Sequence, residues 1–241
     1  MQRKQQSQMP LQIRRPPGYT DKSIRISDRF NRRLTALLKV ILITGAMLEL
    51  LQGDWLTAIA TLGVVVITFL PVALGQRFDV RIPPEFELLA VIFVCASLFL
   101  GEVHGYYLKY WWWDSLLHTS SGLLLGIFGF LLVYVMNEKE DLQFSLKPSF
   151  VALFAFAFAL AIGVIWEIME FAIDQTFGTN MQKSGLVDTM WDLIVDGLGA
   201  LTISILGYGY LSTAGSESFL ERWIHHFIII NQRFFRDRHL D

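Results

Sequence analysis

Apolar residues occur in six long runs along the chain, and short polar stretches separate them. A run of about 20 apolar residues matches a bilayer core of roughly 30 Å, because a helix rises 1.5 Å per residue. Each run therefore predicts a membrane-spanning helix, and the fold class is all-α, a polytopic transmembrane bundle of about six helices. The predicted spans are Leu34–Leu51, Trp55–Gly75, Phe86–His104, Leu116–Met136, Phe150–Phe177 and Val187–Leu211.

Polar segments flank the six spans, which together fill residues 34–213. Residues 1–33 are basic, and we expect them to be mostly disordered or to lie on the lipid surface. In residues 214–241, aromatic and aliphatic side chains recur at helical spacing, which predicts an amphipathic helix at the membrane interface. His225 and His226 fall on its polar face, where a solvated position is the ordinary interpretation and a metal site the alternative.

Composition supports a membrane protein. Hydrophobic residues make up 53% of the chain and charged residues 17%, with a mean hydropathy of +0.44; soluble domains carry about 25% charged residues. Since Cys95 is the single cysteine, no intrachain disulfide can form. The sequence contains neither a Walker loop nor a GxGxxG pattern. We therefore expect membrane lipid as the partner, with no nucleotide and no nucleic acid.

The basic residues predict an orientation. Of the 20 lysines and arginines, 17 fall on one side of a six-span arrangement. Lys109 and Lys183 fall on the other side, and Lys39, one turn into the first span, could extend towards the basic side. The positive-inside rule then predicts a multi-pass protein of the bacterial inner membrane with both termini in the cytoplasm. The tyrosines and tryptophans at 106–113 are interpreted as an aromatic belt at the opposite interface.

Acidic residues gather in the outer half of this arrangement, where ten of them face two lysines and no arginine. Many share helix faces at spacings of three, four or seven residues. Charged side chains at membrane depth are costly, so they face the bundle interior or water and usually find partners. The acids on these shared faces, together with His118, are Asp114 on the fourth span, Glu167, Glu170 and Asp174 on the fifth, and Asp188, Asp192 and Asp196 on the sixth.

Three arrangements would compensate this cluster: protonated carboxyls, a bound cation, or a hydrated outward cavity. Interhelical hydrogen bonding without a ligand is the purely structural alternative. We predict a divalent cation of unknown identity as cofactor. An adjacent carboxylate such as Asp114 commonly orients a metal-bound histidine. The expected ligands are Asp114, His118, Asp188 and Asp192, and the expected acid/base residues are Glu167, Glu170 and Asp196.

Three motifs on the later spans resemble a known family. They are Trp112–His118 followed by Ser121–Gly122, then Trp166–Phe171, and finally Asp188, Trp191–Asp192, Asp196 and Gly199–Ala200. This pattern resembles the YjdF-like family of bacterial inner-membrane proteins and is more faintly similar to VanZ-like proteins. The resemblance implies a helical membrane fold. It implies no reaction, because the YjdF-like family has no established activity.

The leading functional hypothesis is cation binding in an outward-facing cavity, with metal-dependent hydrolysis or group transfer on a lipid-borne or periplasmic substrate. Without an arginine on that side, a phosphate group could bind there only through a bridging metal. One alternative is a transporter or channel whose acids carry protons or cations. Another is a non-catalytic partner of a second membrane protein.

The predicted orientation can be tested with reporter fusions. Fusions after Met136 and after the C-terminus should report the cytoplasm, whereas a fusion near Gly178 should report the periplasm, since the lysine and arginine distribution places them on opposite sides. A periplasmic C-terminus would contradict the orientation and the outward-facing cavity built on it.

Overall fold

The computed structural model of the protein describes residues 21–138, 146–212, 223, 226–227 and 230–231. Six stretches of helix in this part of the chain are long and apolar enough to cross a membrane, which confirms the predicted all-α class and the six spans. They are Ile26–Leu51, Trp55–Arg77, Pro84–Val103, Trp113–Val133, Pro148–Phe177 and Leu186–Ser212.

Two of the spans consist of more than one helical element. The second contains α2 and α3, which are separated at Thr68 and Phe69, just before Pro71. The third changes from α-helix to π-helix at Cys95. The helices are α1 (Asp21–Leu51), α2 (Trp55–Ile67), α3 (Leu70–Arg77), α4 (Pro84–Val94), η1 (Cys95–Val103), α5 (Tyr106–Lys109), α6 (Trp113–Glu138), α7 (Pro148–Phe177) and α8 (Leu186–Ser212).

The flanking segments differ in part from their predicted form. Helix α1 begins at Asp21, so residues 21–33 continue the first helix, whereas we expected disorder or a lipid-surface position. Residues 1–20 lie outside the described part of the chain. So does most of the amphipathic helix predicted within 214–241, of which Trp223, His226, Phe227, Ile230 and Asn231 are described.

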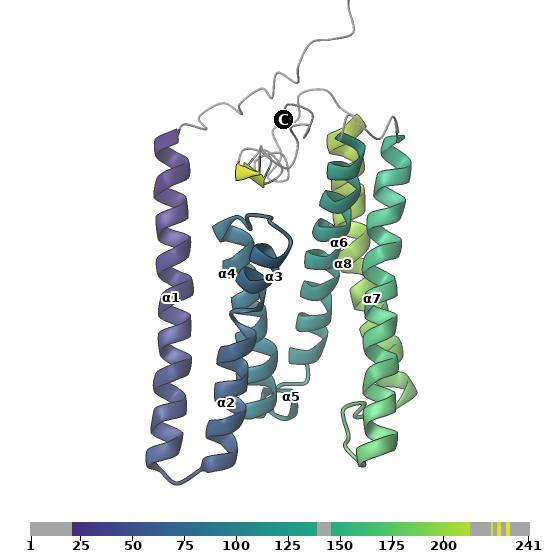
Figure 1. Ribbon diagram of the computed structural model, residues 1–241. Helices are drawn as coiled ribbons and strands as arrows, with labels where there is room; N and C mark the ends of the chain where they lie inside the picture. Colours follow the sequence, from purple (N-terminus) through teal and green to yellow (C-terminus); the bar gives the residue numbers. More distant parts are fainter. Residues whose placement is uncertain (1–20, 139–145, 213–222, 224–225, 228–229, 232–241) are drawn as a thin grey trace, which may run out of the picture.

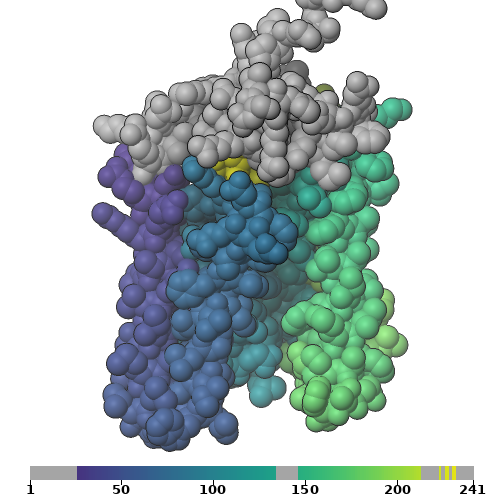
Figure 2. All heavy atoms as spheres, viewed as in Figure 1, coloured from purple at the N-terminus to yellow at the C-terminus, as the bar shows by residue number. Residues whose placement is uncertain are grey.

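The spans pack as two groups (Figure 1). Helices α6, α7 and α8 pack against one another, and α1 packs on α2 and α4. The start of α1 and the end of α8 lie at the same end of the bundle, which we name the termini end. The opposite, distal end carries residues 52–54, 104–112 and 178–185. Figure 2 shows a recess in the surface between the two groups towards the distal end.

Helices α6 and α8 approach to backbone contact at two glycines. A Cβ atom built on Gly122 would lie 2.2 Å from the backbone oxygen of Asp196, and one built on Gly199 would lie 2.5 Å from that of Thr119. Small residues permit such close crossings between membrane helices. This crossing lies beside the predicted acidic residues of α8 and brings α6 within reach of them.

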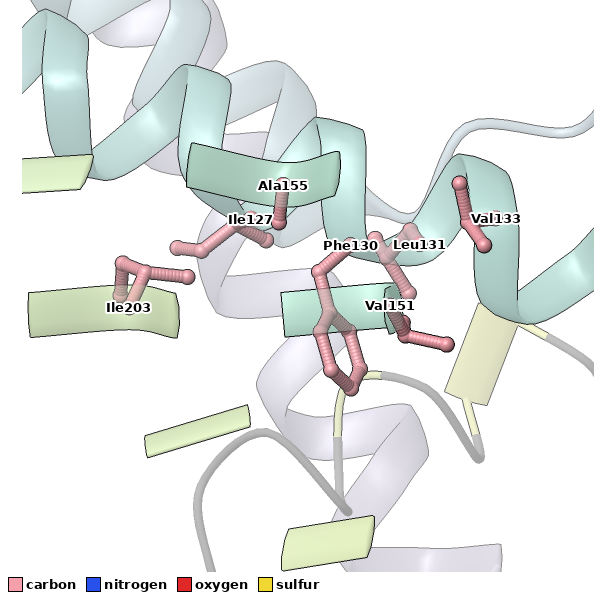
Figure 3. Close-up of a cluster of buried hydrophobic side chains, with 7 residues drawn as sticks. All are labelled: Ile127, Phe130, Leu131, Val133, Val151, Ala155 and Ile203. Atoms are coloured by element: carbon pink, nitrogen blue, oxygen red, sulfur yellow. The ribbon is translucent and has the colours of Figure 1, made fainter. Parts of the chain in front are cut away.

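An apolar cluster fills the bundle between this crossing and the termini end (Figure 3). Phe130 at its centre has no solvent exposure, and Ala155 of α7 is equally buried. Ile203 contributes from α8. Because the three helices share this core, their polar distal halves rest on a tightly packed base. The cluster consists of Ile127, Phe130, Leu131, Val133, Val151, Ala155 and Ile203.

Two charged residues outside the α6–α8 group have structural partners. Asp54 caps α2 by accepting hydrogen bonds from the Thr57 amide at 3.2 Å and the Thr57 hydroxyl at 2.7 Å. Lys39 donates to Glu87 at 3.0 Å and lies 4.3 Å from the centre of the Phe69 ring. Lys39 therefore pairs inside the bundle, whereas we expected it to extend to the basic surface.

The glycine crossing can be tested by Gly199→Ala. The added methyl group would overlap the α6 backbone, so we expect a loss of about 1–3 kcal/mol in stability, measured as a lower melting temperature in detergent. Gly63→Ala is the matched control, because nothing lies within 4 Å of its added methyl group and alanine favours helix by about 1 kcal/mol. Equal melting temperatures for the two variants would contradict the crossing.

Candidate metal site at the distal half of the bundle

His118 lies at the centre of the acidic residues and is 8% exposed. Its Nδ1 atom lies 3.1 Å from Asp196 Oδ2. Its Nε2 atom lies 3.7 Å from Asp114 Oδ1 and 3.8 Å from Glu167 Oε1. The two ring nitrogens therefore have separate roles: one is hydrogen-bonded to α8, and the other faces carboxylates of α6 and α7.

Asp196 is the deepest of these acids and is 2% exposed. It accepts a hydrogen bond from the Ser121 hydroxyl as well as contacting His118. A Cβ atom on Gly163 of α7 would lie 2.6 Å from Asp196 Oδ2. The absence of a side chain at this glycine therefore leaves room for the carboxylate, which is enclosed by all three helices.

Asp114 has a cationic partner. Lys183, in the loop between α7 and α8, donates to Asp114 Oδ2 at 2.7 Å. The lysine ammonium also lies 5.0 Å from the centre of the Tyr107 ring. Burial, followed by the negative charges of Asp114 and Glu102, raises the pKa of the Tyr107 phenol.

Glu167 has no comparable partner. The residue is 3% exposed. Neither carboxylate oxygen has a partner within strict hydrogen-bond geometry among the described residues, although the Thr189 hydroxyl and the Gln182 side-chain amide interact with the carboxyl group. Its nearest charged neighbour in an ion pair is the His118 ring. A buried carboxylate without a well-placed donor is destabilised by several kcal/mol unless something else compensates it.

Three other predicted residues lie nearer the distal surface. Glu170 accepts a hydrogen bond from the Trp166 indole at 2.9 Å. Asp188 accepts from the Lys183 amide at 3.0 Å. Asp174 accepts from the Thr179 hydroxyl at 2.6 Å and from the amides of residues 181 and 182 at 2.8 and 2.9 Å. Asp174 and Asp188 thus hold the α7–α8 loop, and Glu170 holds the exposed indole of Trp166.

Three side chains could hold a metal ion together. Ligand atoms of Asp114, His118 and Asp192 all lie within 4.8 Å of one another. Nitrogen and oxygen ligands of a tetrahedral zinc are about 3.4 Å apart, close to the 3.7 Å between His118 Nε2 and Asp114 Oδ1. Asp196 on Nδ1 matches the carboxylate that commonly orients a metal-bound histidine, the role that we assigned to Asp114.

The six predicted spans lie within the match to a recognised protein family. A family model described as a predicted membrane protein, DUF2238, matches residues 30–213. This chain belongs to the DUF2238 family. The match includes every predicted span and every predicted site residue. It supports the resemblance to a family of membrane proteins, and it brings no activity with it.

A relative of this DUF2238 chain is an uncharacterised protein of Thermotoga maritima, 31% identical over 128 residues. The alignment covers 53% of this chain and 64% of the relative, so the chain spans less than two thirds of that protein. No solved structure matches the chain. The fold and the site geometry of this family member are therefore described from its own structure alone.

Several residues of the site were not expected from the sequence of this DUF2238 protein. Lys183 and Gln182 belong to a loop, and Gln182 donates to Thr189 Oγ1 at 2.7 Å, which ties the loop to α8. Tyr107 was assigned to an aromatic belt. Ser121 was part of a motif but had no assigned role. Lys183 is one of only two lysines among the ten acids predicted for the outer half, and this pattern could have indicated it as a partner for an acid such as Asp114.

The loop contacts of Asp174 lead to a prediction. Asp174→Ala should accelerate hydrogen exchange of the Met181 and Gln182 amides, because each amide loses its hydrogen bond to the Asp174 carboxylate. Gln175→Ala, at the exposed neighbouring position, is the matched control and should leave these amides unchanged. Unaltered exchange in Asp174→Ala would show that other contacts hold the loop.

Proposed function

We propose that this protein binds a divalent cation at the site around His118 and uses it for hydrolysis or group transfer on a lipid-borne or periplasmic substrate. The observation that carries this proposal is the convergence of buried carboxylates from three helices on one histidine. The finer resemblance to YjdF-like proteins and the cytoplasmic placement of both termini belong to the same proposal. In that orientation the distal end faces the periplasm.

Charge balance supports a bound cation. The carboxylates of Asp114, Glu167, Asp192 and Asp196 are opposed only by Lys183 and His118 among the described residues around the site. A histidine that binds a metal is neutral, so Lys183 alone offsets the acids and three negative charges remain if all four are ionised. A divalent cation would offset two of them and would also interact with Glu167.

The residues then divide into ligands and positioning groups. Asp114, His118 Nε2 and Asp192 would hold the cation, with Asp188 one helical turn nearer the distal surface as a further carboxylate. Asp196, which we expected among the acid/base residues, becomes a positioning residue that orients His118 through Nδ1. Ser121 in turn orients Asp196, because its hydroxyl donates to the other carboxylate oxygen.

The acid/base roles fall to α7. Glu167 would accept the proton of an attacking water or hydroxyl, since it is buried beside His118 and no cationic side chain among the described residues other than His118 pairs with it. Glu170 would return a proton to the leaving group from its position nearer the distal surface. A bound divalent cation would supply Lewis-acid polarisation of the bond under attack. A lipid-borne substrate could reach these residues from the membrane beside the exposed Trp166 and Trp191.

A transporter is the second candidate, and the apolar cluster disfavours it. A transported ion needs access to the same site from both ends of the bundle. Between the site and the termini end, α6, α7 and α8 are packed around Phe130 (Figure 3). Among the described residues of that half of α8, Ser204 is the fully buried hydroxyl and Tyr210 is half-buried near the end of the helix, and these two do not form a continuous proton path. A one-sided site is therefore favoured.

Metal content tests cation binding directly. Protein purified without chelator should contain near-stoichiometric divalent metal by elemental analysis. The Asp192→Asn, Glu167→Gln double variant should contain less metal than the wild type by one ion per chain, because one ligand and the adjacent carboxylate become neutral. Chelator should lower the melting temperature of the wild type by more than that of the double variant.

Glu49→Gln is the control for the metal experiment, since it removes an acidic charge from α1 in the other helix group. It should keep the metal. Metal-free wild type that is insensitive to chelator would contradict cation binding and favour protonated carboxyls.

Two measurements separate the enzyme from the transporter. Cells lacking the protein should accumulate a chemically altered lipid or periplasmic compound, and wild type but not Glu167→Gln should restore the normal profile. In proteoliposomes the purified protein should show no proton or cation flux, because the apolar cluster closes the termini end. A flux that disappears in Asp196→Asn would overturn the enzyme proposal.

A further inference from the structure

A second cluster of ionisable side chains lies at the termini end, far from the site around His118. It joins three segments that are distant in the sequence: α1, the start of α4 and the C-terminal segment. Ligand atoms of Asp28, Glu85 and His226 all lie within 4.8 Å of one another. The described part of the C-terminal segment lies over the ends of α3 and α4 (Figure 1).

His226 is buried, with 2% exposure, although the sequence pattern predicted a solvated position. Its Nδ1 atom lies 2.6 Å from Glu85 Oε1. Its Nε2 atom lies 3.7 Å from Asp28 Oδ1. Neither His226 Nε2 nor Asp28 Oδ1 has a hydrogen-bond partner among the described residues. A polar nitrogen that is removed from water therefore points into the cluster without a donor or acceptor of its own.

The geometry of this cluster repeats that of the distal site. In each, one carboxylate contacts histidine Nδ1 and a second carboxylate lies 3.7 Å from Nε2. When Nδ1 carries the ring proton, it donates a hydrogen bond to Glu85, and the lone pair of Nε2 then faces Asp28. A separation of 3.7 Å is close to the roughly 3.4 Å between ligands of a tetrahedral metal, whereas it is too long for a direct hydrogen bond.

Independent contacts dock the same segment. Asn231 accepts a hydrogen bond from the Arg81 amide at 2.7 Å and donates to the Arg81 carbonyl at 2.9 Å. Trp223 packs edge-on against Phe86, with ring centroids 5.2 Å apart. These contacts hold the segment against the bundle apart from the acidic residues, and Asp28 Oδ1 has no hydrogen-bond partner among the described residues.

We propose that Asp28, Glu85 and His226 bind a divalent transition metal that fastens the C-terminal segment to α1 and α4. One imidazole with two carboxylates suits zinc or a similar first-row ion, whereas magnesium prefers oxygen ligands alone. Binding would satisfy the buried Nε2 atom and would link the last segment of the chain to the first helix. This inference is independent of the proposed function, because it involves none of the distal residues.

Zinc binding in a variant that lacks the distal site tests this proposal. In the full-length Asp192→Asn, Glu167→Gln protein, equilibrium dialysis after chelator treatment should find one zinc per chain, undisturbed by excess magnesium. Adding His226→Gln to this variant should abolish zinc binding. Adding Asp28→Asn should do the same, and this substitution leaves the contacts of Asn231 and Trp223 in place. His225→Gln is the matched control and should retain it.

Hydrogen exchange supplies a second readout. At a zinc concentration ten times the dissociation constant, exchange of the Arg81 amide should slow about tenfold, since the metal stabilises the docked segment. The effect should vanish in His226→Gln. The second site would be overturned if the Asp192→Asn, Glu167→Gln variant bound no zinc. It would also be overturned if zinc binding persisted after His226→Gln or Asp28→Asn was added to that variant. Either result would leave cation binding at His118 untouched, which the metal content of His226→Gln measures separately.

Discussion

The contact between His118 and Asp196 depends on how closely α6 and α8 approach. Gly122 lies against the backbone of Asp196, and Gly199 lies against that of Thr119. A larger residue at either position would separate the helices, and the 3.1 Å contact between the imidazole and the carboxylate would be lost. Because that contact sets the orientation of the ring, it also decides which carboxylates face Nε2. The arrangement of the distal site therefore depends on two glycines, whose lack of a side chain permits the close crossing.

Compensation of charge is the second constraint on this bundle. Buried carboxylates are tolerated where a base or a set of donors meets them, as Lys183 does for Asp114 and Lys39 does for Glu87. Asp174 meets its donors in the α7–α8 loop instead. Glu167 is compensated less, since in the described part of the chain neither of its oxygens has a partner within strict hydrogen-bond geometry and only the Thr189 hydroxyl, the Gln182 amide and the His118 ring lie against it.

Hydropathy and spacing predicted the six spans and the shared faces of the acids, because both depend on local periodicity. The break between α2 and α3 could also have been predicted, since Pro71 cannot continue the hydrogen bonding of a helix. Other features depend on contacts between distant segments. The sequence does not show that the loop residue Lys183 folds back onto Asp114, nor which ring nitrogen of His118 meets Asp196.

The largest departure from the sequence pattern is His226. Helical periodicity placed it on a polar face, but Asn231 and Trp223 dock the segment, and His226 meets Asp28 and Glu85. A helical wheel assumes that a polar face meets water, whereas His226 meets carboxylates of the bundle. The amphipathic pattern could not identify this contact, because it lies between segments that are distant in the sequence.

Stability and binding chemistry are divided along the axis of the α6–α8 group. Towards the termini end, Phe130 and its neighbours fill the space between the helices and provide the packing that holds them together. Towards the distal end, the same helices contribute buried acids whose desolvation opposes folding. A cation bound there would stabilise the folded state in proportion to its affinity and concentration. The packed half can then maintain the geometry of a polar half whose buried acids oppose folding.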